Sequence, residues 1–270
     1  MRLNHSLLPM IDYHKAKDLM WNPRHIRYDQ DRSDWATMSE TERDLILRVG
    51  SLFLAGEEAV AHDLAPLLVA VRREGGHIED EFFLTTQIFE EAKHMEFFDG
   101  WFDEVVGVVD WESYLGESYA PIFFQALPEA LNRLLTDSSV RAQVEASVIY
   151  HMIIEGVLAE TGYHGFYQAL KSRNLQPGLV QGLEYVQRDE ARHIAFGVYF
   201  LQRHVCADPE LWDVIEARMS ELLPMALNIV GDVFIPYGES IPFNLDVSEM
   251  LLYASEQFNK RLHAVERATH

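Results

Sequence analysis

The pattern Glu-x-x-His occurs twice in stretches that otherwise look like buried helices, and it limits the possible folds of this chain more than any other feature. Glu91 and His94 lie in "IFEEAKHMEFF", and Glu190 and His193 lie in "QRDEARHIAFGVYF". Residues three positions apart share one face of an α-helix, so each pair can bind one ion. An ionised carboxylate in a protein core is costly unless it is paired or coordinates a metal. The chain therefore needs a helical fold that brings these groups to a common partner.

Two more glutamates extend the pattern. Glu57 lies in "LFLAGEEAV" and Glu155 lies in "YHMIIEGVL". Glu57 precedes Glu91 by 34 residues and Glu155 precedes Glu190 by 35, so the two halves match in order and spacing. One Glu from each of two helices and one Glu-x-x-His from each of the other two is the known arrangement of ferritin-like bundles that bind two metal ions. The predicted fold is all-α, a ferritin-like four-helix bundle core with additional helices.

Helical periodicity dominates the chain, and no sustained alternation of apolar and polar residues indicates a sheet. Ser39 and Glu42 form a capping-box pattern ahead of the first long helix, and Asp246 with Glu249 caps the last helix. We expect a single ferritin-like domain over residues 1–270, with its core at about 40–205 and extra helices at about 208–265. The four long helices are predicted at about 39–75, 79–106, 140–170 and 179–205.

The pattern also predicts the type of metal site. Two divalent cations carry a charge of +4, which balances four carboxylates while both imidazoles stay neutral. Cys206 is the only cysteine, which excludes an internal disulfide and a thiolate-rich zinc site. Oxygen and nitrogen ligands suit iron or manganese, and also zinc, which offers no redox chemistry. The predicted metal ligands are Glu57, Glu91, His94, Glu155, Glu190 and His193.

Three of these glutamates have a competitor nearby in the sequence. The stripe of large apolar residues on the first helix and the matched spacing of the two halves decide between them. On these grounds we prefer Glu57 to Glu58, Glu91 to Glu90, and Glu155 to Glu160.

Other polar residues near the motifs have open roles. Asp189 either orients a ligand histidine, as ligating imidazoles usually require, or is a solvated acid. Arg192 is either a surface charge or a neighbour of the ligands. We expect His62, His151 and His164 in the bundle interior or at the surface rather than among the ligands.

Composition limits the partners. The formal net charge of −21 argues against nucleic acid and anionic membranes, although such acidity can also serve solubility alone. No stretch approaches about 18 uncharged apolar residues, and Pro9, Asp12 and His14 interrupt the first apolar run too early for a signal peptide. We expect a cytoplasmic protein without a membrane span.

The motifs "EEAKH", "IIEGVLAETGYHGFY" and "DEARH" resemble the ribonucleotide reductase small-subunit superfamily, over about Trp21 to Phe258. In small subunits that form a stable tyrosyl radical, the Tyr usually lies four residues beyond the first ligand His, where this chain has Phe98. Reductase small subunits also end in a flexible tail with a Tyr, whereas the last Tyr here is Tyr253. Both departures argue against a reductase role, although one reductase subgroup also lacks the radical Tyr.

The chain resembles more closely the ligand-binding oxidase branch, whose cofactor is manganese and iron. In that branch a Val one turn after the first ligand Glu is joined to a Tyr shortly before the third-helix Glu, and Val60 and Tyr150 fill these positions. The resemblance implies that dioxygen activated at the metals oxidises the Val60 Cβ–H and the Tyr150 phenol together, forming an ether cross-link. Tyr150 lies about 140° around an ideal α-helix from Glu155, so periodicity alone does not aim it at the metals. Tyr163 takes the place of another tyrosine near the site.

The resemblance further implies a ligand and a reaction. The ligand is a long-chain fatty acid or similar apolar carboxylate, with its carboxylate at the metals and its tail in an apolar tunnel. Affinity trends favour iron in both positions, so a di-iron centre is an alternative to the Mn/Fe pair. We therefore predict an oxygen-activating oxidoreductase, and we expect a homodimer.

Three other functions are alternatives to the oxidase. The first is a ribonucleotide reductase small subunit that lacks the radical tyrosine. The second is a multicomponent-monooxygenase hydroxylase, from whose motif Lys93 departs, and the third is a ferritin-like metal store.

Overall fold

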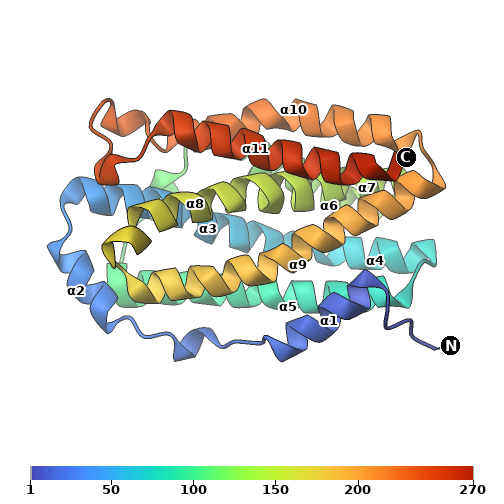
Figure 1. The fold of residues 1–270 in the computed structure, drawn as a ribbon, viewed down its shortest axis with the longest axis horizontal. Helices are drawn as coiled ribbons and strands as arrows, with labels where there is room; N and C mark the ends of the chain where they lie inside the picture. The colour runs from blue at the N-terminus through green and yellow to red at the C-terminus, as the bar shows by residue number, and fades with distance from the viewer. Residues whose placement is uncertain (1, 270) are drawn as a thin grey trace.

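The fold is described from a computed structural model that covers residues 2–269, and all regular structure in these residues is helical (Figure 1). This confirms the all-α prediction. The α-helices are α1 (Leu8–Asp18), α2 (Asp29–Thr37), α3 (Glu40–Asp63), α4 (Ala65–Glu74), α5 (Ile78–Trp101), α6 (Leu127–Arg133), α7 (Val140–Ser147), α8 (Glu160–Ala169), α9 (Pro177–Ala207), α10 (Leu211–Asp232) and α11 (Val247–Glu266). Three segments are π-helical: η2 (Phe102–Val106), η4 (Pro121–Ala126) and η5 (Val148–Ala159). Short 3₁₀ turns are η1 (Pro23–His25), η3 (Trp111–Tyr114), η6 (Lys171–Arg173), η7 (Ile235–Tyr237), η8 (Pro242–Asn244) and η9 (Arg267–Thr269).

Four long helical rods form the central bundle. They are α3, α5, the continuous run α7–η5–α8, and α9, and they lie roughly along the long axis of the molecule (Figure 1). Helices α10 and α11 pack against η5 on one side of this bundle, while α1 packs against α5 and α9 on the other. The ferritin-like core with additional helices is therefore as predicted.

The first long helix differs from its prediction. It begins with the predicted capping box, in which the Glu42 amide donates to Ser39 Oγ at 3.3 Å and the Ser39 amide donates to Glu42 Oε2 at 2.9 Å. It does not continue to residue 75, because α3 ends at Asp63 and α4 begins at Ala65. Pro66 has no amide hydrogen to continue the α-helical hydrogen-bond ladder. The prediction of one continuous helix is therefore wrong at this point.

The start of α9 is fixed by acids on α2. Asp31 accepts hydrogen bonds from the amides of Gly178 and Leu179, both at 2.8 Å, and Asp34 accepts one from the Gln176 amide at 2.8 Å. Carboxylates in this position satisfy the free amides at a helix start and interact favourably with its dipole. The register of α9, which carries Glu190 and His193, is thereby tied to α2.

Two glycines allow α9 to approach its neighbours closely. A Cβ atom at Gly182 would lie 2.0 Å from Cε2 of Phe97 on α5, and one at Gly197 would lie 2.3 Å from Cβ of His151 on η5. Both distances are far below a van der Waals contact. The close approach brings the side chains of three rods to one point in the core.

One stretch of the described residues, Leu211–Tyr237, is long and apolar enough to cross a membrane by length and composition alone. It contains α10, which packs against η5 and α11, and core helices of soluble proteins pass the same test.

We predict that Gly182→Ala lowers the free energy of unfolding by about 1–3 kcal/mol, because Phe97 has to move to accommodate the added methyl group. Chemical denaturation monitored by circular dichroism measures the change. Gly100→Ala on α5 is the matched control, since no described atom lies within 4 Å of the added Cβ. In that variant the free energy of unfolding should rise by about 0.5–1 kcal/mol. Equal stability of the two variants would contradict the close packing of α9 on α5.

Candidate metal centre

The bundle brings the six predicted residues together at its centre. Glu57 comes from α3, Glu155 from η5, and the two Glu-x-x-His motifs come from α5 and α9. None is more than 6% exposed. Ligand atoms within 4.8 Å of one another form two groups: Glu57, Glu91, His94 and Glu190; and Glu91, Glu155, Glu190 and His193. Glu91 and Glu190 belong to both groups.

Both histidines turn Nδ1 into this cluster. Nδ1 of His94 lies 3.2 Å from Glu190 Oε1 and 3.6 Å from Glu57 Oε2. Nδ1 of His193 lies 3.1 Å from Glu91 Oε1 and 3.4 Å from Glu155 Oε1. Each imidazole thus turns Nδ1 toward the glutamates of the cluster and Nε2 toward residues outside the cluster.

Two of the three preferred glutamates differ from their competitors in burial. Glu57 and Glu155 are buried within the cluster, whereas Glu58 and Glu160 are half-buried, with Glu160 near Gln187. Glu90 is buried like Glu91 but belongs to neither group of ligand atoms. His151 is fully buried, His164 is half-buried and His62 is exposed, and none of them belongs to either group of ligand atoms. The two groups of ligand atoms contain only the six residues predicted as ligands.

Two acids outside the cluster hold the far ring nitrogens of the histidines. Asp189 Oδ2 lies 3.4 Å from His94 Nε2, and Glu90 Oε2 lies 2.9 Å from His193 Nε2. Each acid directly precedes the ligand glutamate of its own motif but contacts the histidine of the other motif. Asp189 is therefore a buried orienting group, and not a solvated acid.

Sequence reasoning had treated Glu90 only as a rival to Glu91 and so missed its role. A signal was present, because "EEAKH" and "DEARH" match at five successive positions as acid, Glu, Ala, base and His. An orienting role for Asp189 therefore implied the same role for Glu90.

The bases of the two motifs neutralise these outer acids. Lys93 Nζ and Arg192 Nη2 each lie 2.7 Å from Asp189, and Arg192 also pairs with Glu90. Trp21 Nε1 donates to Asp189 at 2.7 Å. Arg192 is buried, so it is not a surface charge. Two acids and two bases cancel, which leaves the four inner carboxylates as the uncompensated charge.

The pKa values of the inner groups follow from this confinement. Burial raises the pKa of Glu57 to about 8 and raises that of Glu155 well above its ordinary value. Burial lowers the pKa of His94 and His193, but the neighbouring carboxylates outweigh it, so both pKa values lie well above the ordinary value. The imidazoles likewise outweigh burial at Glu91 and hold its pKa well below the usual range. Without cations, protons balance the charge of the cluster.

The cluster fits two metal ions. Several of its atoms have no hydrogen-bond partner among the described residues, namely Glu57 Oε2, His94 Nδ1, Glu155 Oε2, Glu190 Oε2 and His193 Nδ1. Buried polar atoms without partners are rare and costly in native proteins. Four carboxylates and two imidazoles supply the oxygen and nitrogen donors that iron and manganese accept.

Tyr150 reaches the cluster because its helix is a π-helix. Hydrogen bonds in a π-helix run from i to i+5, so residues five apart, such as Tyr150 and Glu155 in η5, lie on the same face. The angular separation expected for an α-helix therefore does not apply. The Tyr150 hydroxyl is fully buried and donates to Glu91 Oε1 at 2.6 Å. Burial and then the charge of Glu91 raise the pKa of Tyr150 well above its ordinary value.

A second buried group holds Glu155. Gln87 Nε2 donates to Glu155 Oε1 at 3.0 Å, and Gln87 Oε1 lies 3.4 Å from His151 Nε2. His151 Nδ1 lies 2.9 Å from Ser147 Oγ, and burial lowers the pKa of His151 to about 3, so the ring is neutral. The sequence left His151 either in the interior or at the surface, and sequence reasoning missed its connection to Glu155.

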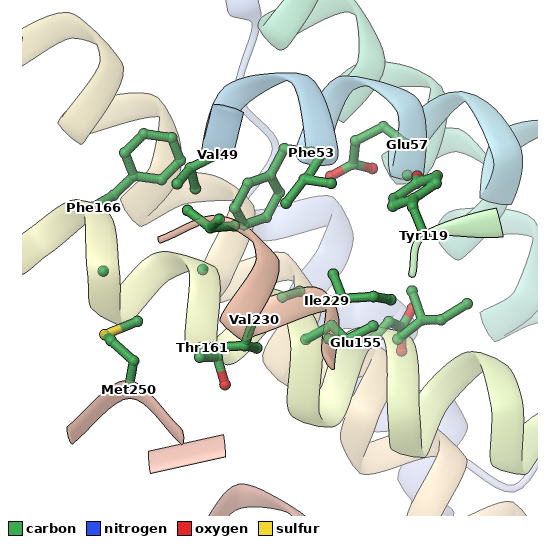
Figure 2. Close-up of a pocket in the computed structure, with 18 of the residues that line it drawn as sticks. Val49, Phe53, Glu57, Tyr119, Glu155, Thr161, Phe166, Ile229, Val230 and Met250 are labelled. Atoms are coloured by element: carbon green, nitrogen blue, oxygen red, sulfur yellow. The ribbon is translucent and has the colours of Figure 1, made fainter. Parts of the chain in front are cut away.

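An apolar cavity leads away from the cluster between α3, α8 and α10. Figure 2 shows Glu57 and Tyr119 at one end and Phe166 and Met250 at the other. All four inner glutamates and Val60 line the cavity, but His94 and His193 do not. The cluster therefore opens to the cavity on its carboxylate side.

Phe98, Tyr253 and Tyr163 all pack against aromatic rings. Phe98 is fully buried and stacks on Phe53, with ring centroids 5.2 Å apart, and so offers no phenol. Tyr253 lies within α11 and stacks on His164. Tyr163 is fully buried and stacks on Phe53.

Comparison with known proteins identifies the family. The sequence profile described as "Ribonucleotide reductase, small chain" matches residues 11–268. The chain belongs to the ribonucleotide reductase small-chain family. Within this family it belongs to the branch of the R2-like ligand-binding oxidases, as the similarity to solved structures shows. A variant of that oxidase with an anaerobically reconstituted Mn/Fe cofactor is 38% identical, with 98% of this chain and 95% of that chain covered and a TM-score of 0.92.

Two further structures give the same result. The oxidase with an aerobically reconstituted Mn/Fe cofactor after a long soak is 37% identical over 98% of this chain and 94% of that chain, with a TM-score of 0.93. The oxidase with an aerobically reconstituted metal cofactor after photoconversion is 37% identical over 98% and 95%, also with a TM-score of 0.93. Other structures are variants at a Glu, at a Val three residues later, and at two Tyr thirteen residues apart. Glu57, Val60, Tyr150 and Tyr163 have the same spacing in this chain.

We predict that the metal-free protein loses stability as the pH rises from about 6.5 to about 8. In this window unfolded Glu and His side chains are deprotonated, whereas the folded protein keeps protons on Glu57, whose pKa is about 8, and on Glu155, His94 and His193. The folded state therefore binds more protons, and the free energy of unfolding falls with pH. Denaturation at a series of pH values measures the slope, which Glu57→Gln should reduce. A flat or rising curve would contradict the assignment.

Proposed function

We propose that this chain is an oxygen-activating dinuclear oxidase that uses one manganese and one iron ion. The observation that carries the proposal is the buried cluster of four carboxylates and two imidazoles, in a chain similar over nearly its whole length to R2-like ligand-binding oxidases. One ion would be held by Glu57, Glu91, His94 and Glu190, and the other by Glu91, Glu155, Glu190 and His193. Affinity trends alone favour iron in both positions, so the Mn/Fe pair rests on the relatives.

The protein groups around the ions have defined tasks. When bound, two redox-active ions supply the electrons that activate dioxygen. Asp189 and Glu90 hold the Nε2–H groups of His94 and His193, which leaves the Nδ1 lone pairs free for the cations. The four carboxylates balance the charge of two divalent ions. None of the six side chains is more than 6% exposed, so the site is shielded from bulk solvent.

We further propose that Val60 and Tyr150 become joined by an ether bond. The Val60 Cβ–H and Tyr150 O–H bonds break and a Cβ–O bond forms, so two electrons and two protons leave, and dioxygen accepts the electrons. Tyr150 already donates its hydroxyl hydrogen to Glu91 Oε1 at 2.6 Å, which provides a carboxylate acceptor for the phenol proton. Val60 is 4% exposed and lines the cavity next to the cluster.

The cavity supports a long-chain fatty acid or a similar apolar carboxylate as the ligand. Its lining is apolar apart from the glutamates at the cluster, Tyr119 and Thr161. The transfer of an aliphatic tail from water into this apolar cavity is favourable. The carboxylate head of such a ligand would lie at the cations. The predicted homodimer and cytoplasmic location stay predictions.

The alternative of a reductase small subunit is less well supported. Phe98 stands where the radical-forming subunits have their Tyr, and it offers no phenol. The Val, Glu and two Tyr positions varied in the oxidase structures have counterparts here at the same spacing. These observations favour the oxidase.

We predict that Glu91→Ala and His193→Ala abolish loading of two metal ions, because each removes a ligand from a charge-balanced site. Metal content is measured by mass spectrometry of the elements after aerobic loading with manganese(II) and iron(II). Glu58→Ala is the control, since Glu58 directly follows Glu57 but belongs to neither group of ligand atoms. Two ions per chain in Glu91→Ala would refute the ligand assignment, and equal manganese and iron content in the wild type would support the mixed pair.

We predict that aerobic loading lowers the intact mass of the wild-type protein by two hydrogen atoms. Peptide mapping should then find the peptides of Val60 and Tyr150 joined. Protein loaded without oxygen, and the Tyr150→Phe variant loaded in air, should keep separate peptides. Fully unmodified wild-type protein after aerobic turnover would count against the cross-link while leaving the metal assignment intact.

A further inference from the structure

The cavity contains one hydroxyl whose role is not yet explained. Besides the four inner glutamates, the polar side chains in its lining are Tyr119 and Thr161. Thr161 Oγ1 donates to the carbonyl of Val157 at 2.7 Å. The Tyr119 hydroxyl is buried and has no hydrogen-bond partner among residues 2–269. Tyr119 therefore holds the uncommitted hydrogen-bond donor of the cavity.

The Tyr119 ring is held firmly in place. It stacks on Phe123 with ring centroids 4.1 Å apart and an interplanar angle of 3°, and its amide donates to the carbonyl of Gly116 at 3.0 Å. A Cβ atom at Gly56 would lie 3.7 Å from the Tyr119 hydroxyl, so this oxygen sits against α3 beside the first ligand glutamate. Figure 2 shows Tyr119 next to Glu57 at the metal end of the cavity.

The hydroxyl is a donor under ordinary conditions. The ordinary pKa of a tyrosine phenol is about 10, so the phenol keeps its proton at neutral pH. Glu57 Oε2 is one of the cluster atoms that the metal ions would engage, so the Tyr119 hydroxyl is the group in the cavity lining still without a partner. A buried donor that lines a cavity without a partner indicates that a ligand there accepts its hydrogen bond.

We propose that the Tyr119 hydroxyl donates a hydrogen bond to the polar head of the apolar ligand, and so selects ligands whose head is an acceptor such as a carboxylate. This inference rests on the proposed function, because it requires an apolar ligand in the cavity. A head at this end lies near the cations, while its tail extends toward Phe166 and Met250. Tyr119 touches the ligand and is therefore a specificity-determining residue.

The test compares two probes on the metal-loaded enzyme. Dodecanoate has an acceptor head, and dodecane has the same chain without one. Tyr119→Phe keeps the ring and its stacking on Phe123 but removes the hydroxyl. We expect this variant to bind dodecanoate roughly tenfold to a hundredfold more weakly, the usual effect of losing a hydrogen bond to a charged group, and to bind dodecane unchanged. Native mass spectrometry measures the fraction of protein that carries each probe over a series of probe concentrations, and so gives the affinities for dodecanoate and dodecane.

The control is Tyr167→Phe, which removes a phenol that bonds to Gln187 outside the cavity. It should bind both probes as the wild type does. A second measurement is the melting temperature without ligand, which Tyr119→Phe should not lower, because the lost hydroxyl has no partner in the protein.

The outcomes are distinguishable. Selective loss of dodecanoate supports the inference. Unchanged binding of dodecanoate, or equal loss of both probes together with a lower melting temperature, would overturn it and leave the oxidase proposal intact. If the wild type binds neither probe, the ligand part of the proposed function fails, and this inference fails with it.

Discussion

Four carboxylates in the interior of one helical bundle repel one another, and much of the surrounding architecture reduces that repulsion. Glu90, Lys93, Asp189 and Arg192 form an outer layer with no net charge, so it adds nothing to the charge of the inner groups. Protons balance the inner glutamates in the metal-free state, and two divalent cations would replace these protons. Burial in a tightly packed core makes each uncompensated carboxylate charge more costly. Binding of two divalent cations would remove this cost and so stabilise the bundle.

Much of the site could be predicted because metal ligands impose spacing on a helix. The i, i+3 repeat and the matched halves located six residues that the structure gathers within reach of each other. Local backbone geometry was harder to predict. The break before Pro66 offered a sequence signal that was not used, whereas nothing in "VIYHMIIEGVLA" distinguishes a π-helix from an α-helix by periodicity. The partners of His94 and His193 cross between helices, and contacts of that kind depend on tertiary packing.

The π-helix and the cavity make the two sides of the metal centre different. Residues five apart lie on one face of η5, so Tyr150 and Glu155 both face the cluster. The histidines are enclosed by the outer acids, while all four inner glutamates line the cavity. Reagents that arrive through the cavity thus meet Val60 and the carboxylates, and not the imidazoles. The bonds that face the cavity are therefore the ones exposed to such reagents.

The outer layer treats the two histidines unequally. Asp189 is shared by Lys93, Arg192 and Trp21 and lies 3.4 Å from His94 Nε2, whereas Glu90 pairs with Arg192 and lies 2.9 Å from His193 Nε2. An acceptor engaged by fewer donors and closer to the ring gives its imidazole more electron density. His193 therefore faces the carboxylate that is shared with fewer donors. The near-repeat in the sequence thus gives the two proposed ion positions different surroundings, so they would not be equivalent to two unlike ions.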